Sequence, residues 1–137
     1  MKRWRKMLSV LMVCVTVLSL CVVPVMAVDV MPRYNNLGSA TSDAWVSSDG
    51  ELSVEYKYTG ISYTSEVVIK TTVEKKTMLF FWSDVAEWTD TVYSTTYYDI
   101  ATLQLDDTGT YRVTVEYTAY GTGGAADTVT HEMEVEY

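Results

Sequence analysis

The feature that most constrains the fold is an alternation of apolar and polar side chains along much of the chain. Residues 51–59 place a large apolar side chain at every second position, and the positions between carry charged or hydroxyl groups. The same alternation occurs in residues 66–74, 111–118 and 129–137. A period of two is typical of strands with one face on a core and the other in water. The pattern therefore predicts an all-β protein.

Turn signals separate these stretches at intervals that suit antiparallel strands. They are Ser47-Ser48-Asp49-Gly50, Thr59-Gly60, Lys75-Lys76, Ser83-Asp84, Asp106-Asp107-Thr108-Gly109 and Gly121-Thr122-Gly123-Gly124. The runs between them predict seven or eight strands, which need two packed sheets or a barrel to bury their apolar faces. We expect one domain over residues 39–137, after an irregular lead-in over residues 28–38 that contains Pro32.

Residues 100–113 identify the kind of sandwich. This segment resembles the passage between the fifth and sixth strands of immunoglobulin-like domains, with Asp107, Gly109 and Tyr111 at the spacing of the family's corner motif. The resemblance implies that the Tyr111 ring is buried and that its hydroxyl bonds to backbone upstream, as in a tyrosine corner. The paired cysteines of antibody domains are absent, and residues 66–74 lack a core tryptophan. The resemblance therefore implies an immunoglobulin-like or fibronectin-type antiparallel sandwich.

The N-terminus has the organisation of a secretory signal peptide. Four basic residues, all before Met7, precede an apolar run over residues 7–23, and small or tolerated residues follow up to Ala27. This order predicts a signal-peptide helix over residues 1–27, cleaved between Ala27 and Val28, and a secreted, extracellular protein. A retained single-pass anchor is the alternative, which Pro24 and Ala27 disfavour.

Cleavage would leave a strongly acidic domain. The leader would take four of the 10 basic residues and none of the 18 acidic ones. Such a surface repels nucleic acid and anionic headgroups, so we expect no nucleic-acid partner and no membrane association after cleavage. Both cysteines, Cys14 and Cys21, lie in the leader. We therefore expect no disulfide, metal site or cofactor in the remaining domain.

Catalytic residues are not indicated. His131 is the only histidine, and the alternation places it on the core face of its strand, so we interpret it as structural. Asp49, Asp84 and Asp106 fall in turns, where aspartate bonds to its own backbone. The residue types alone leave a glycosidase-like carboxylate pair open. We expect the protein not to be an enzyme.

The aromatic stretch over residues 79–88 is the best candidate for a binding surface. Phe80, Phe81 and Trp82 are consecutive, and neighbours on a strand point in opposite directions, so at least one is exposed or covered by a loop or partner. Phe81, Trp82 and Trp88 form the hypothetical contact surface for a protein or carbohydrate, which Tyr97-Tyr98 would extend. In the alternative interpretation, residues 82–88 form a loop that folds back over its own strand.

The predicted leader and the spacing of Lys75-Lys76, Trp82 and Trp88 are similar to a family of small secreted Gram-positive bacterial proteins of unknown function. The sequence favours a secreted, monomeric, non-catalytic binding module. The first alternative is an envelope-active effector that resembles a bacteriocin, or the partner that protects against one. A small hydrolase is the third.

Overall fold

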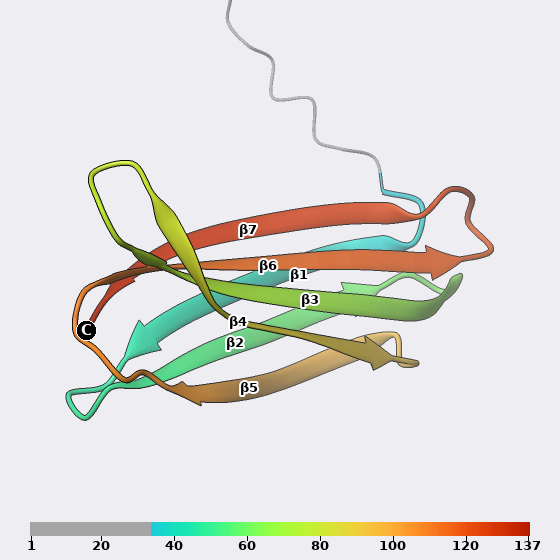
Figure 1. The fold of residues 1–137 in the computed structure, drawn as a ribbon. Helices are drawn as coiled ribbons and strands as arrows, with labels where there is room; N and C mark the ends of the chain where they lie inside the picture. The colour runs from blue at the N-terminus through green and yellow to red at the C-terminus, as the bar shows by residue number, and fades with distance from the viewer. Residues whose placement is uncertain (1–33) are drawn as a thin grey trace, which may run out of the picture. The chain divides into compact units, whose positions relative to one another are not determined.

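The computed structural model describes residues 34–137, which form seven strands, each antiparallel to its neighbours (Figure 1). The strands are β1 (Leu37–Val46), β2 (Glu51–Gly60), β3 (Thr64–Lys76), β4 (Trp82–Val92), β5 (Thr96–Gln104), β6 (Thr110–Gly121) and β7 (Asp127–Glu136). The prediction of an all-β antiparallel sandwich with seven or eight strands is confirmed. The expected signal-peptide helix and its cleavage site at Ala27 and Val28 lie outside the described residues.

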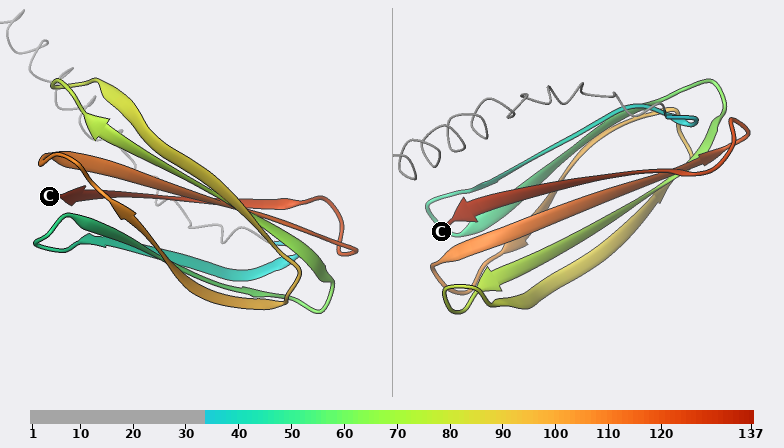
Figure 2. Two further views of the ribbon diagram at one scale, coloured as in Figure 1. Left: turned by 60° about the horizontal axis from the view of Figure 1, so that its bottom comes forward. Right: turned by 90° about the horizontal axis from the view of Figure 1, so that it is seen from above.

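The strands form two sheets, with the orders β1-β2-β5 and β4-β3-β6-β7. Figure 2 shows the two sheets as facing layers. In constant-type immunoglobulin domains the fourth strand joins the first sheet. Here β4 pairs with β3 over its whole length, in the second sheet. The architecture is compatible with an immunoglobulin-like fold.

The core lies between the layers and is built mainly from the alternating residues of the three central strands, β2, β3 and β6. The inward residues of β6 are buried from end to end, as its sequence pattern predicts. Fourteen apolar side chains form the buried cluster: Leu37, Leu52, Val54, Tyr56, Tyr58, Val67, Ile69, Val73, Leu105, Tyr111, Val113, Val115, Tyr117 and Ala119.

Tyrosine is the large residue of this core. Tyr56, Tyr58, Tyr111 and Tyr117 are its bulkiest side chains, and each is at most 2% exposed. Each hydroxyl reaches a hydrogen-bond partner, as where Tyr58 donates to the carbonyl of Ser94 at 2.8 Å. Within residues 34–137 no buried side-chain nitrogen or oxygen lacks a partner. Burial of a tyrosine ring is favourable only when its hydroxyl is satisfied in this way.

A buried carboxylate holds the backbone at the start of β1. Asp127, at the start of β7, accepts hydrogen bonds from the backbone N–H groups of Asn36 and Leu37, the latter at 3.0 Å. Burial alone would raise the pKa of Asp127, but the backbone donors around Asn36 outweigh burial and lower this pKa. β1 begins at Leu37, so the last two residues of the predicted lead-in belong to the first strand.

One predicted turn is wrong. Ser83 and Asp84 lie inside β4, next to an irregularity in the register between Val73 and Glu74 of β3. The extra residue is Val85, so the strand continues past a β-bulge where the sequence suggests a break. Residues 82–88 are therefore strand, and they do not form a loop folded over their neighbour.

Candidate functional site

The connection between β3 and β4 carries the most exposed apolar side chains in the described part of the chain. β3 ends at Lys76 and β4 begins at Trp82, and these two residues are paired. The Thr77 N–H donates to the carbonyl of Phe81 at 2.9 Å, and the Thr77 hydroxyl bonds to the same oxygen at 3.3 Å. These bonds close the hairpin, and we call residues 78–81 the β3–β4 tip.

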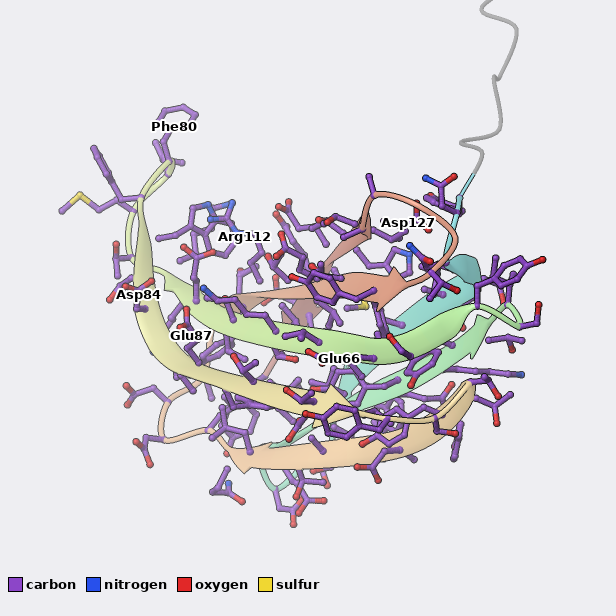
Figure 3. All side chains as sticks on the ribbon, turned by 90° about the vertical axis from the view of Figure 1, so that its right-hand side faces the viewer. Glu66, Phe80, Asp84, Glu87, Arg112 and Asp127 are labelled. Atoms are coloured by element: carbon purple, nitrogen blue, oxygen red, sulfur yellow. The ribbon has the colours of Figure 1, made fainter. Side chains whose placement is uncertain are left out.

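All four side chains of the tip are large, apolar and open to solvent. Met78 is 69% exposed, Leu79 82%, Phe80 85% and Phe81 65%. Figure 3 shows Phe80 at the far end of the hairpin, away from the body of the sandwich. Phe80 and Phe81 are also the only two phenylalanines in the sequence. The chain therefore places both of them where they contribute nothing to the core.

The three residues named from the sequence as a contact surface have different environments. Phe81 belongs to the exposed tip. Trp82 is half-buried at the base of the tip, with the Arg112 guanidinium 4.4 Å from its ring centroid. Trp88 packs against the core, and its indole N–H donates to the Tyr56 hydroxyl at 3.1 Å. The structure thus places Phe81 and Trp82 together at the tip and its base, and it packs the partly buried Trp88 against the core, away from them.

Trp88 packs against the core from β4, the strand next to the one in which a core tryptophan is expected. It lies directly opposite Thr71 of β3. Thr71 is buried and shares a hydrogen bond of 2.8 Å with the same Tyr56 hydroxyl. The indole that residues 66–74 lack is thus supplied by the neighbouring strand.

The contact residues named from the sequence omit Met78, Leu79 and Phe80, although Leu79 and Phe80 lie in the aromatic stretch over residues 79–88. The available signal was the run of seven uncharged residues from Thr77 to Ser83, between Lys76 and Asp84. The most exposed residues lie at the middle of this run, where the chain turns.

The charged groups at the base of the tip are mostly paired. Arg112 binds Glu74 through two nitrogens at 2.7 and 2.8 Å. Lys75 lies 3.3 Å from the carboxylate of Asp107. Lys76 stands 5.6 Å above the Trp82 ring, on which the Arg112 guanidinium also lies. The base is therefore an aromatic platform with cations on it.

The corner residues named from the sequence lie at the same end of the sandwich as the tip. Tyr111 is buried, and its hydroxyl donates to the carbonyl of Asp107, which is the geometry of a tyrosine corner. Gly109 has φ +146°, a conformation that favours glycine, and it exchanges two backbone hydrogen bonds with Tyr137. The corner thus also fastens the C-terminal residue.

His131 bridges the two sheets. Its Nδ1 lies 3.2 Å from the Ser42 hydroxyl, and its ring packs edge-on against Tyr117 at 5.9 Å between centroids. Burial lowers its pKa. The Ser42 hydroxyl also lies 2.9 Å from the Tyr117 hydroxyl. Within residues 34–137 no carboxylate is hydrogen-bonded to this imidazole, so this serine–histidine contact lacks the third member of a triad.

Tyr97 and Tyr98 do not extend the tip. They lie in β5, after the loop that leaves the opposite end of β4. Tyr97 stacks on Tyr58 with 5.8 Å between ring centroids, and burial, followed by the hydrogen bond to Asp99, raises its pKa to about 12. Tyr98 donates to Glu55 at 3.0 Å. Both line a shallow hollow between β2 and β5.

The sequence matches no model of a known protein family, and no curated protein is significantly similar to it. Over the described residues, no cluster of three or more histidine, cysteine or acidic side chains is arranged to hold a metal ion. The same residues contain no helix long and apolar enough to span a membrane.

Proposed function

We propose that this chain is a secreted, non-catalytic binding module whose contact surface is the β3–β4 tip. The observation that carries the proposal is the exposure of four consecutive large apolar side chains, from Met78 to Phe81, on a hairpin closed by its own hydrogen bonds. Exposed apolar groups that form one continuous patch are typical of interaction sites.

The fold does not require these side chains. The tip side chains are absent from the core cluster and from the partly buried residues that pack against it. An exposed apolar patch carries an aggregation hazard without adding stability, so its presence on a hairpin is best explained by a partner that covers it. The basic and apolar N-terminal segment supports secretion of the module. The resemblance to small secreted Gram-positive proteins makes the envelope of such a bacterium the first material in which to seek a partner.

The test is site-specific photo-crosslinking. A photoreactive phenylalanine analogue replaces Phe80, and a matched variant carries it at Thr102, an exposed position on β5 in the other sheet. Both proteins are irradiated with cell-envelope fractions of a Gram-positive bacterium. We expect adducts from position 80 and few from position 102. Equal labelling at the two positions would contradict a contact surface at the tip.

An envelope-active effector is the second candidate, because it would use the same apolar tip. It differs from a binding module in breaching the membrane that it contacts. Release of a trapped dye from vesicles separates the two functions.

A further inference from the structure

We infer that the β3–β4 tip inserts into the interface of a zwitterionic phospholipid bilayer. The inference rests on the proposed function, because it names the partner of the same surface. Its particular claim is that a lipid surface covers residues 78–81, rather than a pocket on another protein or a sugar.

The shape of the tip favours a bilayer over a protein pocket. Four consecutive side chains are each at least 65% exposed, although neighbouring residues in a chain point in different directions. The tip is therefore apolar on all its sides. A protein pocket would have to enclose the hairpin to cover them. A bilayer covers all four side chains as the hairpin enters it, because hydrocarbon chains surround an inserted group in every direction.

The chemistry of the tip favours lipid over a protein or a sugar. No side chain between Met78 and Phe81 carries a hydrogen-bonding or charged group other than the weakly accepting sulfur of Met78. Protein interfaces have about one hydrogen bond per 100–200 Å². Sugars likewise require polar side chains beside the aromatic rings. The lipid interface requires only apolar surface.

The base of the tip carries residue types that suit the lipid headgroup region. Trp82 is half-buried directly below Phe81, and Lys76 and Arg112 lie over its ring. Tryptophan has an apolar body and a polar N–H, and long cationic side chains place an apolar stem below a charged end. These residue types suit the depth of the lipid headgroups, just outside the hydrocarbon that the tip would occupy.

The charges around the tip bear on the class of lipid that it would enter. Glu74 and Asp107 neutralise Arg112 and Lys75, so the base of the tip has little free positive charge. The rest of the domain is acidic and repels an anionic bilayer. Insertion therefore favours zwitterionic lipid.

The expectation of no membrane association came from net charge alone. It described the long-range repulsion of anionic lipid by the whole domain. That repulsion does not oppose contact between neutral lipid and the uncharged residues from Thr77 to Ser83, because a hydrophobic contact involves no net charge.

The experiment uses residues 28–137, which include all seven strands and the buried cluster, so we expect this form to fold into the sandwich. Far-UV circular dichroism checks its strand signal. Flotation with phosphatidylcholine vesicles measures binding for three proteins. These are the wild-type domain, the tip variant Leu79→Ser/Phe80→Ser, and the control variant Tyr63→Ser/Tyr93→Ser. The control removes two exposed aromatics from loops at the other end of the hairpin.

We expect the wild type and the control variant to float with the vesicles. The fraction of the tip variant bound to vesicles should correspond to a partition coefficient at least about tenfold lower than that of the wild type, because two large apolar side chains no longer leave water. In the variant Phe80→Trp, brominated lipid should quench the indole fluorescence more strongly than in the wild type, whose Trp82 lies at the base of the tip. Equal flotation of the tip and control variants, or no stronger quenching, would overturn the inference.

Two further comparisons separate the possible sources of binding. Added phosphatidylglycerol should weaken flotation at low salt, and high salt should restore it. Binding that requires phosphatidylglycerol and disappears in salt would overturn hydrophobic insertion. Crosslinks from position 80 to a protein or glycan, without flotation, would overturn insertion while the proposed binding function stands. Dye release with flotation would support insertion and favour the effector over the binding module.

Discussion

The interior of the sandwich and the β3–β4 tip use aromatic side chains in opposite ways. The bulkiest buried residues are four tyrosines, whereas both phenylalanines, Phe80 and Phe81, are exposed. Burial normally suits phenylalanine better, because its ring brings no polar atom into the core. The distribution in this protein is the reverse.

Hydrogen bonding explains the buried half of the comparison. The Tyr56 hydroxyl joins Thr71 of β3 to Trp88 of β4, and the Tyr117 hydroxyl donates to the Thr41 carbonyl of β1 at 2.9 Å. A tyrosine core therefore links the two sheets with directional bonds as well as apolar contact. No such explanation applies to the tip, whose phenylalanines make no contribution to the core cluster. Stability accounts for the tyrosines, and a partner at the tip is what we propose for the phenylalanines.

The largest expected effect comes from removing a core ring. Tyr117→Ala should lower the free energy of unfolding by about 3–5 kcal/mol, because it leaves a cavity beside Tyr58 and His131. Urea denaturation followed by far-UV circular dichroism measures the change. A loss below about 1 kcal/mol would show that the core relaxes around the missing ring.

The matched variant Tyr117→Phe keeps the ring and removes the hydroxyl. It should cost about 1 kcal/mol, because the Ser42 hydroxyl loses one of its partners. A cost as large as that of Tyr117→Ala would assign the stability to the hydrogen bonds rather than to the ring.

The next effect concerns the buried carboxylate at the start of β7. Asp127→Asn should cost about 1–3 kcal/mol at neutral pH, because the charged acceptor of two buried N–H groups is lost. The lowered pKa of Asp127 means that its contribution is present above the ordinary value of 3.8 and is lost as the pH falls below it.

Urea titrations at several pH values test this sign. The difference in unfolding free energy between wild type and Asp127→Asn should shrink as the pH falls below 3.8. A difference that is constant with pH would mean that Asp127 contributes through shape rather than charge.

The smallest expected effect is at the tip. Leu79→Ser/Phe80→Ser should change the free energy of unfolding by less than about 0.5 kcal/mol, because these side chains are nearly as exposed as in the unfolded chain. The same denaturation assay measures it. A loss comparable to that of Tyr117→Phe would mean that the tip stabilises the sandwich, which would remove the contrast between the two regions.

The alternation of residues predicted the strands that became β2, β3, β6 and β7, because each has one face on the core and one in water. It failed for β4, an edge strand that contains a β-bulge. Past the irregularity at Val73 and Glu74, the residues on each face of β4 change places. Ser83-Asp84 therefore has the composition of a turn, although pairing with β3 holds it extended.

The candidate site was located only in part, for a related reason. The sequence indicates that Phe80, Phe81 and Trp82 cannot all face one core. It does not indicate which of them lies beyond the end of the sheet. Cross-strand pairing decides that, since Trp82 pairs with Lys76 while Phe80 lies in the connection. Trp88 likewise is partly buried against the core because its partner Thr71 belongs to a core-facing row.

The sequence by itself determined the strand content, the corner at Asp107, Gly109 and Tyr111, and the acidic charge, because these depend on residue type and on spacing along one segment. The tertiary structure alone decided which aromatic side chains are available to a partner. Exposure depends on what the other strands place around a side chain. Trp88 is partly buried against the core and bonds to Tyr56 of the other sheet, whereas the β3–β4 tip extends past the body of the sandwich (Figure 3).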